Sequence, residues 1–228
     1  MHAGPEADPA NVMSPQSSRQ TARQALRRAL IAQREALPPQ TVTAWSRAIC
    51  EHLQQEFPRL AQQRVAFCWP IRNEADLRPL IERWLRDGDS DFVPLLPVVT
   101  APGAALAFRR WLPEAPLTLD RHGIPTPSAG EFIIPNALLI PVNAFDAHGY
   151  RLGYGGGYFD RTLAAANPRP LAIGIGFAQA QVDSVEPEDH DMRLDVIVTE
   201  QGIVKPLPAD PRDTPSKPGD RIGISDNR

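Results

Sequence analysis

The spacing of apolar residues predicts three helices in the N-terminal part of the chain. Their apolar positions recur at intervals of three, four and seven residues, which is the period of an amphipathic helix. The three stripes consist of Leu26, Leu30 and Leu37, of Val42, Trp45, Ile49 and Leu53, and of Leu77, Leu80, Ile81, Trp84 and Leu85. Pro38 separates the first two helices and Gly88 follows the third, as expected of residues that end helices.

Continuous apolar runs of strand length alternate with helical patterns. The runs occupy residues 64–69, 91–95, 136–142, 171–176 and 195–199, and a fourth helix is predicted over residues 159–166. Residues 97–130 are rich in proline and glycine around the short apolar run 105–108, so we expect a hairpin and a long loop there. This alternation predicts an α/β fold with a mostly parallel sheet and helices on both faces.

The composition favours one domain with a polar segment at each end. A chain of 228 residues can bury one sizeable core, and residues 18–205 are predicted to form it. Residues 1–17 and 206–228 are polar, lack hydrophobic periodicity and are predicted to be disordered tails. Apolar runs stay far below the roughly 20 residues needed to span a bilayer, so we expect a cytoplasmic protein.

Charge and cysteine content narrow the possible partners. The chain has 24 Lys and Arg against 27 Asp and Glu, a net charge of −3. This balance provides no overall positive field to hold a nucleic acid or an anionic membrane, so neither is expected as a partner and any anion binding must be local. Cys50 and Cys68 have no metal-binding spacing and are predicted to be packed thiols.

Three arginines lie on one side of the first predicted helix. Arg23, Arg27 and Arg34 are spaced so that they fall within about 40° of one another, beside the leucine stripe. Taken alone, this row is more simply interpreted as a solvated helix edge with arginines that cover apolar surface.

The segment RLGYGGGYFDR, residues 151–161, connects a buried strand to the fourth helix. Its glycine loop, residues 153–157, can present backbone N–H groups to a phosphate at the carboxyl end of a strand, where open α/β sheets bind ligands. The pattern fits neither G-x-G-x-x-G, because Tyr158 replaces a glycine, nor the P-loop, because it has no lysine. A tight turn without a ligand is the alternative.

A longer segment, LLIPVNAFDAHGYRLGYGGGYFDR, closely resembles the signature of the 5-formyltetrahydrofolate cyclo-ligase (methenyltetrahydrofolate synthetase) family. Other segments resemble family motifs in the family's order: the helix with Arg23 and Arg27, then WPIRNE, HGIPTP and VEPEDHDMRLDVIVTEQG. The resemblance therefore covers residues 20–205.

This resemblance implies a Rossmann-like single domain of the NagB/RpiA/CoA-transferase type. It implies ATP- and Mg²⁺-dependent closure of 5-formyltetrahydrofolate, with or without a polyglutamate chain, to 5,10-methenyltetrahydrofolate, ADP and phosphate, and we expect a monomer. The formyl oxygen would be phosphorylated by ATP, and the N10 amine would attack the carbon of the resulting iminium phosphate. The protein would position the reactants and neutralise phosphoryl charge.

The resemblance also implies roles for individual residues. Those expected to bind ATP are Arg23, Gln24, Ala25, Leu26, Arg27, Arg151, Leu152, Gly153, Tyr154, Gly155, Gly156, Gly157, Tyr158 and Phe159. Those expected to bind the folate are Trp69, Glu74, Tyr154, Gly155, Gly156, Gly157 and Tyr158. Arg151 and Tyr158 are the expected catalytic residues, and Asp160 and Asp191 the expected magnesium ligands.

The chain departs from the family pattern at three places. Arg23 replaces the usual lysine, which keeps the charge and changes its geometry. Val142 and Asn143 stand where the family commonly has a glycine in a P-G turn, and Phe159 replaces the second tyrosine. None of these changes removes a magnesium carboxylate.

Two other functions stay open at this point. Tyr154, Tyr158 and Phe159 beside Arg151 and Arg161 could stack the bases of single-stranded RNA, although the net charge argues against it. A diverged relative with the same fold could instead be a kinase or ligase for another small acceptor. Binding that weakens steeply with salt would identify the first, and activity on other acceptors alone would identify the second.

Overall fold

The computed structural model describes residues 15–87 and 91–208, with side chains from residue 18 onward. The α-helices of these residues are α1 (Pro15–Glu35), α2 (Pro39–Glu56), α3 (Arg78–Asp87) and α4 (Tyr158–Ala165). Two 3-10 turns, η1 (Pro58–Gln62) and η2 (Ala178–Ala180), accompany them. Each helix predicted from apolar spacing is thus confirmed, with ends that shift by a few residues.

A seven-stranded sheet, ordered β11-β10-β9-β6-β1-β2-β3, forms the centre of the domain. Its strands are β1 (Arg64–Ala66), β2 (Val93–Val98), β3 (Ala107–Arg110), β6 (Ala137–Pro141), β9 (Leu171–Ile175), β10 (Val196–Thr199) and β11 (Gly202–Val204). The five inner strands pair in parallel, whereas β3 and β11 pair antiparallel at the two edges. The predicted α/β fold with a mostly parallel sheet is confirmed.

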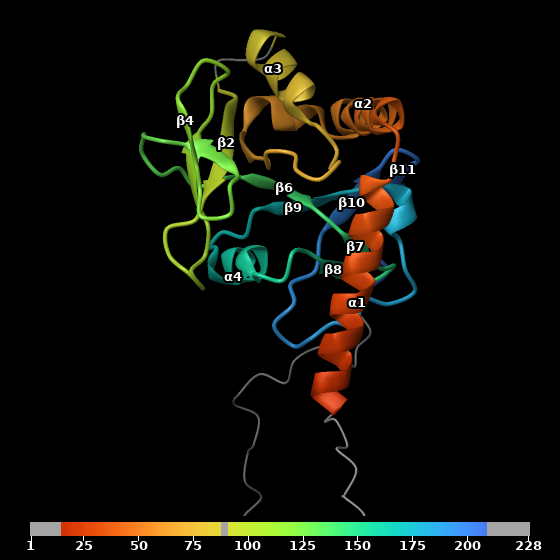
Figure 1. Cartoon of the computed structure of the whole chain (residues 1–228). Helices are drawn as coiled ribbons and strands as arrows, with labels where there is room; N and C mark the ends of the chain where they lie inside the picture. The colour runs from red at the N-terminus through yellow and green to blue at the C-terminus, as the bar shows by residue number, and fades with distance from the viewer. Residues whose placement is uncertain (1–14, 88–90, 209–228) are drawn as a thin grey trace, which may run out of the picture.

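Alternate residues of the strands build two cores, one on each face of the sheet. On one face, Leu139 and Ile173 pack with residues of α2 and α3, including Ile49 and Ile81. On the other face, Leu138 and its neighbours pack with Leu163 of α4. Strands buried on both faces read as continuous apolar runs, which is why the sequence revealed them. Figure 1 shows α2 and α3 above the sheet and α4 below it.

Two short hairpins extend from this framework. β4 (Leu117–Leu119) pairs with β5 (Pro125–Pro127) inside the predicted excursion, and β7 (Ala144–Phe145) pairs with β8 (Arg151–Leu152) just before the glycine loop. The expected hairpin in residues 97–130 is confirmed by the antiparallel pairing of β2 with β3. The β7–β8 hairpin was not predicted, because strands of two residues show no hydrophobic periodicity.

Both ends of the domain extend further than predicted. α1 begins at Pro15, so the helix reaches into the predicted N-terminal tail. At the other end, the Leu207 amide donates to the Ala147 carbonyl at 2.9 Å, which attaches residues 206–208 to the domain. The rest of both predicted tails lies outside the described residues.

The order of the strands places a ligand-binding position between β1 and β6. The chain moves from β1 to β2 on one side, and from β6 to β9 and β10 on the other side. The segments after β1 and β6 therefore diverge at adjacent carboxyl ends, where open α/β sheets bind ligands. The segment after β1 carries Glu74, and the segment after β6 leads to the glycine loop.

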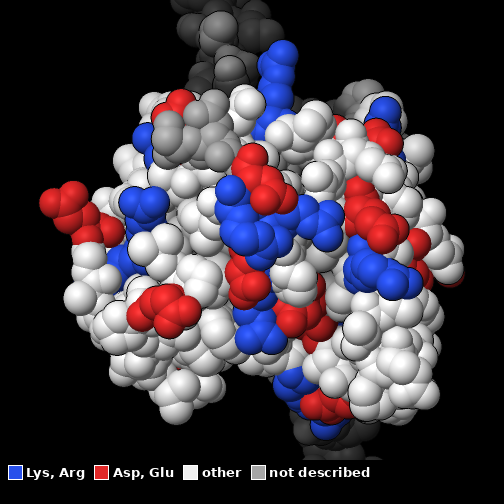
Figure 2. All heavy atoms as spheres, turned by 90° about the horizontal axis from the view of Figure 1, so that it is seen from above, with Lys and Arg blue, Asp and Glu red and all other residues white. Residues whose placement is uncertain are grey.

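Charges of both signs are mixed on the surface that Figure 2 shows, and both cysteines are free thiols, as the sequence predicts. On the face covered by α2 and α3, basic and acidic side chains lie beside one another (Figure 2). Cys50 and Cys68 are free thiols, and burial raises the pKa of Cys50 to about 12 and raises that of Cys68 as well, so both are packed, protonated groups. Among the described helices, none combines the length and apolarity that crossing a membrane requires.

Candidate functional site

The β7–β8 hairpin leads directly into the glycine loop, and the side chain of Asp146 stabilises the turn of this hairpin. The side chain of Asp146 is 2% exposed, and its Oδ1 atom accepts from the amides of His148 and Tyr150 at 3.0 and 3.1 Å. A side chain that bonds backbone two and four residues ahead stabilises a tight turn. Asp146 is therefore a structural residue that sets the start of β8 and the direction of the loop.

The glycine loop is crowded by side chains of the protein itself. A Cβ atom on Gly155 would lie 3.5 Å from the Arg27 guanidinium carbon, and one on Gly157 would lie 2.8 Å from Arg161 Nη1. Both glycines also have positive φ, 94° and 62°, which disfavours any other residue. The positive φ values therefore favour glycine at both positions, and two arginines, one from α1 and one from α4, lie against the loop, which is itself largely exposed.

Five charged residues form an arginine–aspartate cluster beside this loop: Arg23, Arg27, Arg151, Asp160 and Asp191. Arg23 Nη1 lies 2.7 Å from Asp191 Oδ2, and Arg151 Nη2 lies 2.9 Å from Asp160 Oδ1. Arg27 Nε donates to the Gly153 carbonyl at 2.6 Å, and burial together with the charge of Arg23 lowers the pKa of Arg27. The fold thus brings residues from α1, β8, α4 and the 185–195 segment into one cluster.

The backbone of Met192 connects the two carboxylate halves of the cluster. Its amide donates to Asp160 Oδ1 at 3.0 Å, and its carbonyl accepts from Arg151 Nη1 at 2.6 Å, while Asp191 precedes it in the chain. Asp160 therefore bonds to the residue that directly follows Asp191 in the chain. In the described residues no group of three or more His, Cys, Asp or Glu side chains gathers around a common point. A pair of carboxylates still fits Mg²⁺, which commonly takes one or two of them together with phosphate oxygens and water.

A second group, the Glu74 network, consists of Arg34, Glu74, Asn143 and Tyr154. Arg34 donates to Tyr154 Oη and to Asn143 Oδ1, both at 2.8 Å, and Tyr154 Oη donates to Glu74 Oε1 at 2.8 Å. Glu74 is 7% exposed, and burial raises its pKa above the ordinary value although the Arg34 charge opposes this. Arg34 therefore does not join the arginine–aspartate cluster, although it lies on the same side of α1. The turn after β1, the segment after β6 and the glycine loop meet at its guanidinium.

The remaining residues of the predicted site have mixed positions. Tyr158 Oη lies 3.4 Å from His122 Nε2 of the HGIPTP segment, and the Arg161 guanidinium lies 5.1 Å from the centre of the Tyr158 ring, within cation–π range. Trp69 packs edge-on against Trp111, with the Arg78 guanidinium 4.6 Å from its ring centre. Through His122, the proline- and glycine-rich segment 97–130 contacts Tyr158, the first residue of α4, a contact that the sequence did not reveal.

Three residues expected to bind ATP point their side chains into the domain. Leu26 and Leu152 pack together in a small core beneath the β7–β8 hairpin, and Phe159 packs against the core that contains Leu163. Their contribution to a nucleotide site would have to come from backbone atoms. Gln24 and Ala25 are exposed on α1.

The departure from the P-G turn has a packing explanation. The side chain of Val142 fills space that two glycines of the neighbouring strand segment leave open: a Cβ atom on Gly174 or Gly176 would lie 3.4 or 2.5 Å from a Val142 methyl group. Asn143 is buried and accepts from Arg34, so its side chain serves the Glu74 network. Spacing in the sequence could suggest Arg34 as a site residue, but nothing there signalled Asn143.

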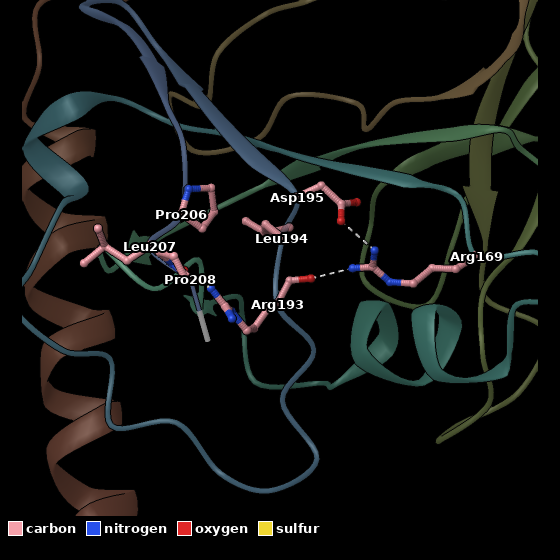
Figure 3. A pocket seen from close by; sticks show the side chains of 7 residues that line it. All are labelled: Arg169, Arg193, Leu194, Asp195, Pro206, Leu207 and Pro208. Atoms are coloured by element: carbon pink, nitrogen blue, oxygen red, sulfur yellow. Dashed lines mark hydrogen bonds and ion pairs between the residues drawn. The ribbon is translucent and has the colours of Figure 1, made fainter. Parts of the chain in front are cut away.

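A cavity of about 420 Å³ lies on another part of the surface and contains none of the predicted site residues. Its charged groups are already paired within the protein: Arg169 bonds to Asp195 and to the Arg193 carbonyl, as Figure 3 shows, and Arg193 donates to the carbonyls of His148 and Leu207. We place the site at the glycine loop instead, because the switch point of the sheet, the arginine–aspartate cluster and the Glu74 network coincide there.

Curated proteins of known name are similar to this chain over most of its length. The 5-formyltetrahydrofolate cyclo-ligase of Escherichia coli K12 is 28% identical over 172 residues, which cover 73% of this chain and 93% of that protein. The enzyme of the same name from Haemophilus influenzae is 28% identical over 158 residues, covering 66% and 83%.

Solved structures and a family sequence model are similar to this chain as well. The NMR structure of 5,10-methenyltetrahydrofolate synthetase from Aquifex aeolicus has a TM-score of 0.70 and 26% identity, and the match covers 82% of this chain and 94% of that one. A synthetase structure from Mycoplasma pneumoniae, at 23% identity and a TM-score of 0.62, shares the fold over 78% and 98%. The model of the 5-formyltetrahydrofolate cyclo-ligase family matches residues 19–200. The chain therefore belongs to the 5-formyltetrahydrofolate cyclo-ligase family.

Proposed function

We propose that this protein converts 5-formyltetrahydrofolate to 5,10-methenyltetrahydrofolate with consumption of ATP and with Mg²⁺ as cofactor. The observation that carries the proposal is the meeting of the arginine–aspartate cluster and the Glu74 network at the switch point of the sheet. One group offers charges for a polyphosphate and its metal, and the other offers a carboxylate for a ring rich in hydrogen-bond donors.

The charges of the arginine–aspartate cluster suit a metal-bound polyphosphate. In the protein alone, Arg23 pairs with Asp191 and Arg151 pairs with Asp160. A phosphate can take the place of each carboxylate on the arginine, while Mg²⁺ takes the place of the arginine on each carboxylate. Both exchanges keep every buried charge compensated. ATP without the metal would leave the two carboxylates unpaired, and Mg²⁺ without ATP would leave the two arginines unpaired, so the site suits the two together.

The proposed chemistry requires activation of a poor electrophile. The formamide nitrogen of the substrate donates into its carbonyl, so the formyl oxygen takes the γ-phosphoryl group and becomes a leaving group. The N10 amine then attacks the same carbon, the imidazoline ring closes, and phosphate departs with the oxygen. Arg151 would stabilise the phosphoryl charge in this transfer, Tyr158 would border the reacting groups, and Mg²⁺ would neutralise phosphate charge.

The substrate end of the site would be the Glu74 network. Glu74 accepts a hydrogen bond from the hydroxyl of Tyr154, an exposed residue of the glycine loop. A carboxylate suits the N–H groups of a reduced pterin, and an aromatic ring can cover its flat face.

The near-ultraviolet absorbance of the methenyl product tests the proposal. Purified protein, 5-formyltetrahydrofolate, ATP and Mg²⁺ should give a rise in absorbance that disappears when any one component is omitted or when the metal is chelated. A complete mixture that gives no rise while the protein still binds ATP would contradict the proposed acceptor and would favour a diverged relative that acts on another small molecule.

A further inference from the structure

Arg34 is a buried cation whose three nitrogens are all used inside the protein. Its Nε donates to the Arg72 carbonyl at 2.9 Å, Nη1 donates to Asn143 Oδ1 at 2.8 Å, and Nη2 donates to Tyr154 Oη at 2.8 Å. Its side chain is 8% exposed. These acceptors belong to the turn after β1, to the segment after β6 and to the glycine loop, so one planar group fixes three segments at the switch point.

The hydrogen bonds of Arg34 also determine the direction of the bond between Tyr154 and Glu74. A guanidinium can only donate, so the Tyr154 hydroxyl accepts from Arg34 and must direct its own proton elsewhere. That proton goes to Glu74 Oε1 at 2.8 Å, and Glu74 Oε2 accepts from the Ile71 amide at 3.1 Å. Both carboxylate oxygens therefore accept. Arg34 Nη2 also lies 3.8 Å from Glu74 Oε1, close enough to favour the ionised carboxylate.

The turn that carries Glu74 is also attached to Glu35, the last residue of α1. Arg72 and Asn73 have positive φ, 51° and 57°, a conformation that asparagine tolerates but that is unfavourable for Arg72. Asn73 Nδ2 donates to the Glu35 carbonyl at 3.1 Å, and Arg72 forms a two-bond ion pair with Glu35 at 2.6 and 2.9 Å. The end of α1 thus holds an unfavourable backbone conformation in place immediately before Glu74.

Asn143 receives its orientation from Arg34. Its Oδ1 accepts from Arg34, whereas its buried Nδ2 has no acceptor among the described residues. The adjoining cavity of about 10 Å³, lined by both side chains, has room for no more than one water molecule. The orientation of the Asn143 side chain therefore depends on Arg34, as does that of the Tyr154 hydroxyl.

From these contacts we propose that Arg34 is a positioning residue that presents Glu74 to the substrate as an ionised carboxylate in one orientation. This inference rests on the proposed function, because it assigns Glu74 to the folate. Arg34 acts through Tyr154 and the turn at residues 71–74 and touches neither ATP nor the reacting carbon. The groups that face Glu74 are Arg34, Arg72, Tyr154 and the Cys68 thiol, and Arg34 is the cation that lowers its pKa most.

The test compares Arg34→Met and Arg34→Lys with Arg28→Met, a control at an exposed arginine of the same helix. Loss of hydrogen bonds to a charged group predicts that Arg34→Met raises the KM for 5-formyltetrahydrofolate about 10–100-fold, while the KM for ATP stays within about twofold. The acid limb of the kcat/KM profile should move to higher pH, because the pKa of Glu74 rises when the cation is removed. Arg34→Lys should restore the acid limb better than the KM, because lysine returns charge without the three-donor geometry.

Several results would overturn the inference. An Arg34→Met protein with native circular dichroism, an unchanged folate KM and an unchanged acid limb would exclude a positioning role, as would equal effects on the KM values of ATP and folate. If Arg34→Met does not fold, Tyr154→Phe provides a second test, because it removes the hydroxyl that links Arg34 to Glu74. This variant should also raise the folate KM, by a smaller factor, and an unchanged KM would overturn the inference.

Absence of cyclisation by the wild-type protein and by Arg28→Met would instead contradict the proposed function. Calorimetric binding of 5-formyltetrahydrofolate without ATP would then decide the role of Arg34, since loss of binding in Arg34→Met supports it and equal binding refutes it.

Discussion

The arginine–aspartate cluster and the Glu74 network use arginines of the same helix in different ways. Arg23 and Arg34 are eleven positions apart on α1, which places them on one side of the helix about 16 Å apart. Arg23 contacts a carboxylate directly at 2.7 Å, whereas Arg34 reaches Glu74 through the Tyr154 hydroxyl and lies 3.8 Å from it. Their burial is similar, with 11% and 8% of each side chain exposed.

The difference between the two groups lies in what could replace each partner. A direct ion pair can exchange its carboxylate for a phosphate and its arginine for a metal ion, so the arginine–aspartate cluster is suited to a charged ligand that arrives with its cation. Arg34 is bound by a carbonyl, an amide and a hydroxyl, which are neutral groups of the protein itself. It is suited to hold the site in shape, and the free acceptor capacity of Glu74 is left for a neutral ring.

The largest expected effect belongs to the cluster. Asp160→Asn should lower kcat by about 10²–10³-fold, because the site would lose a carboxylate for Mg²⁺ while the phosphoryl charge develops. The sequence alone predicts nearly unchanged stability for this variant. The ion pair with buried Arg151 changes that expectation to a loss of about 1–2 kcal/mol.

Steady-state rates at several Mg²⁺ concentrations, together with urea denaturation, would check both values. Asp183→Asn, at an exposed carboxylate in the neighbouring segment, is the matched control. Wild-type turnover in Asp160→Asn, accompanied by a large loss of stability, would make Asp160 a purely structural residue.

An intermediate effect separates two arginines of α1. Arg27→Met should raise the KM for ATP about 10–100-fold and leave the KM for the folate nearly unchanged, because its guanidinium lies against Gly155 and bonds to the glycine loop. Arg34→Met should give the opposite pattern. Initial rates with each substrate varied in turn would show whether the two groups are separate, and Arg28→Met again provides the control. Equal changes in the KM values for ATP and folate in either variant would contradict separate roles for the arginine–aspartate cluster and the Glu74 network.

The smallest expected effect concerns stability and pH at Glu74. Burial raises the pKa of this carboxyl above its ordinary 4.5, so the folded state binds the proton more tightly than the unfolded chain does. Its contribution to stability is complete below the unfolded pKa and is lost as pH rises through the folded pKa. The free energy of unfolding of the wild-type protein should therefore fall relative to that of Glu74→Gln as pH increases above 4.5. Urea denaturation of both proteins from pH 4.5 to 8 measures this difference, and parallel curves would show that Glu74 is not destabilised by burial.

The sequence predicted those parts of the fold that repeat a pattern along the chain. α2 and α3 were found because apolar residues such as Ile49 and Ile81 recur with the helical period, and β6 and β9 because strands buried on both faces are continuously apolar. The two-residue strands β7 and β8 carry no such pattern. They depend on the Asp146 side chain, whose bonds to the backbone no periodicity records.

The sequence by itself determined which residue types are present and on which side of a helix they lie, including the row of Arg23, Arg27 and Arg34 and the glycine loop beside Asp160. Only the tertiary structure decided which partner each of them meets. Helical spacing fixes the direction of a side chain but not the segment that packs against it. Glu74, Asn143 and Tyr154 reach Arg34 from positions 40 or more residues away in the chain. Long-range contacts of this kind arise when β1 and β6 become neighbours in the sheet, and that pairing gives Arg34 other partners than Arg23 and Arg27, which we propose to face a charged ligand.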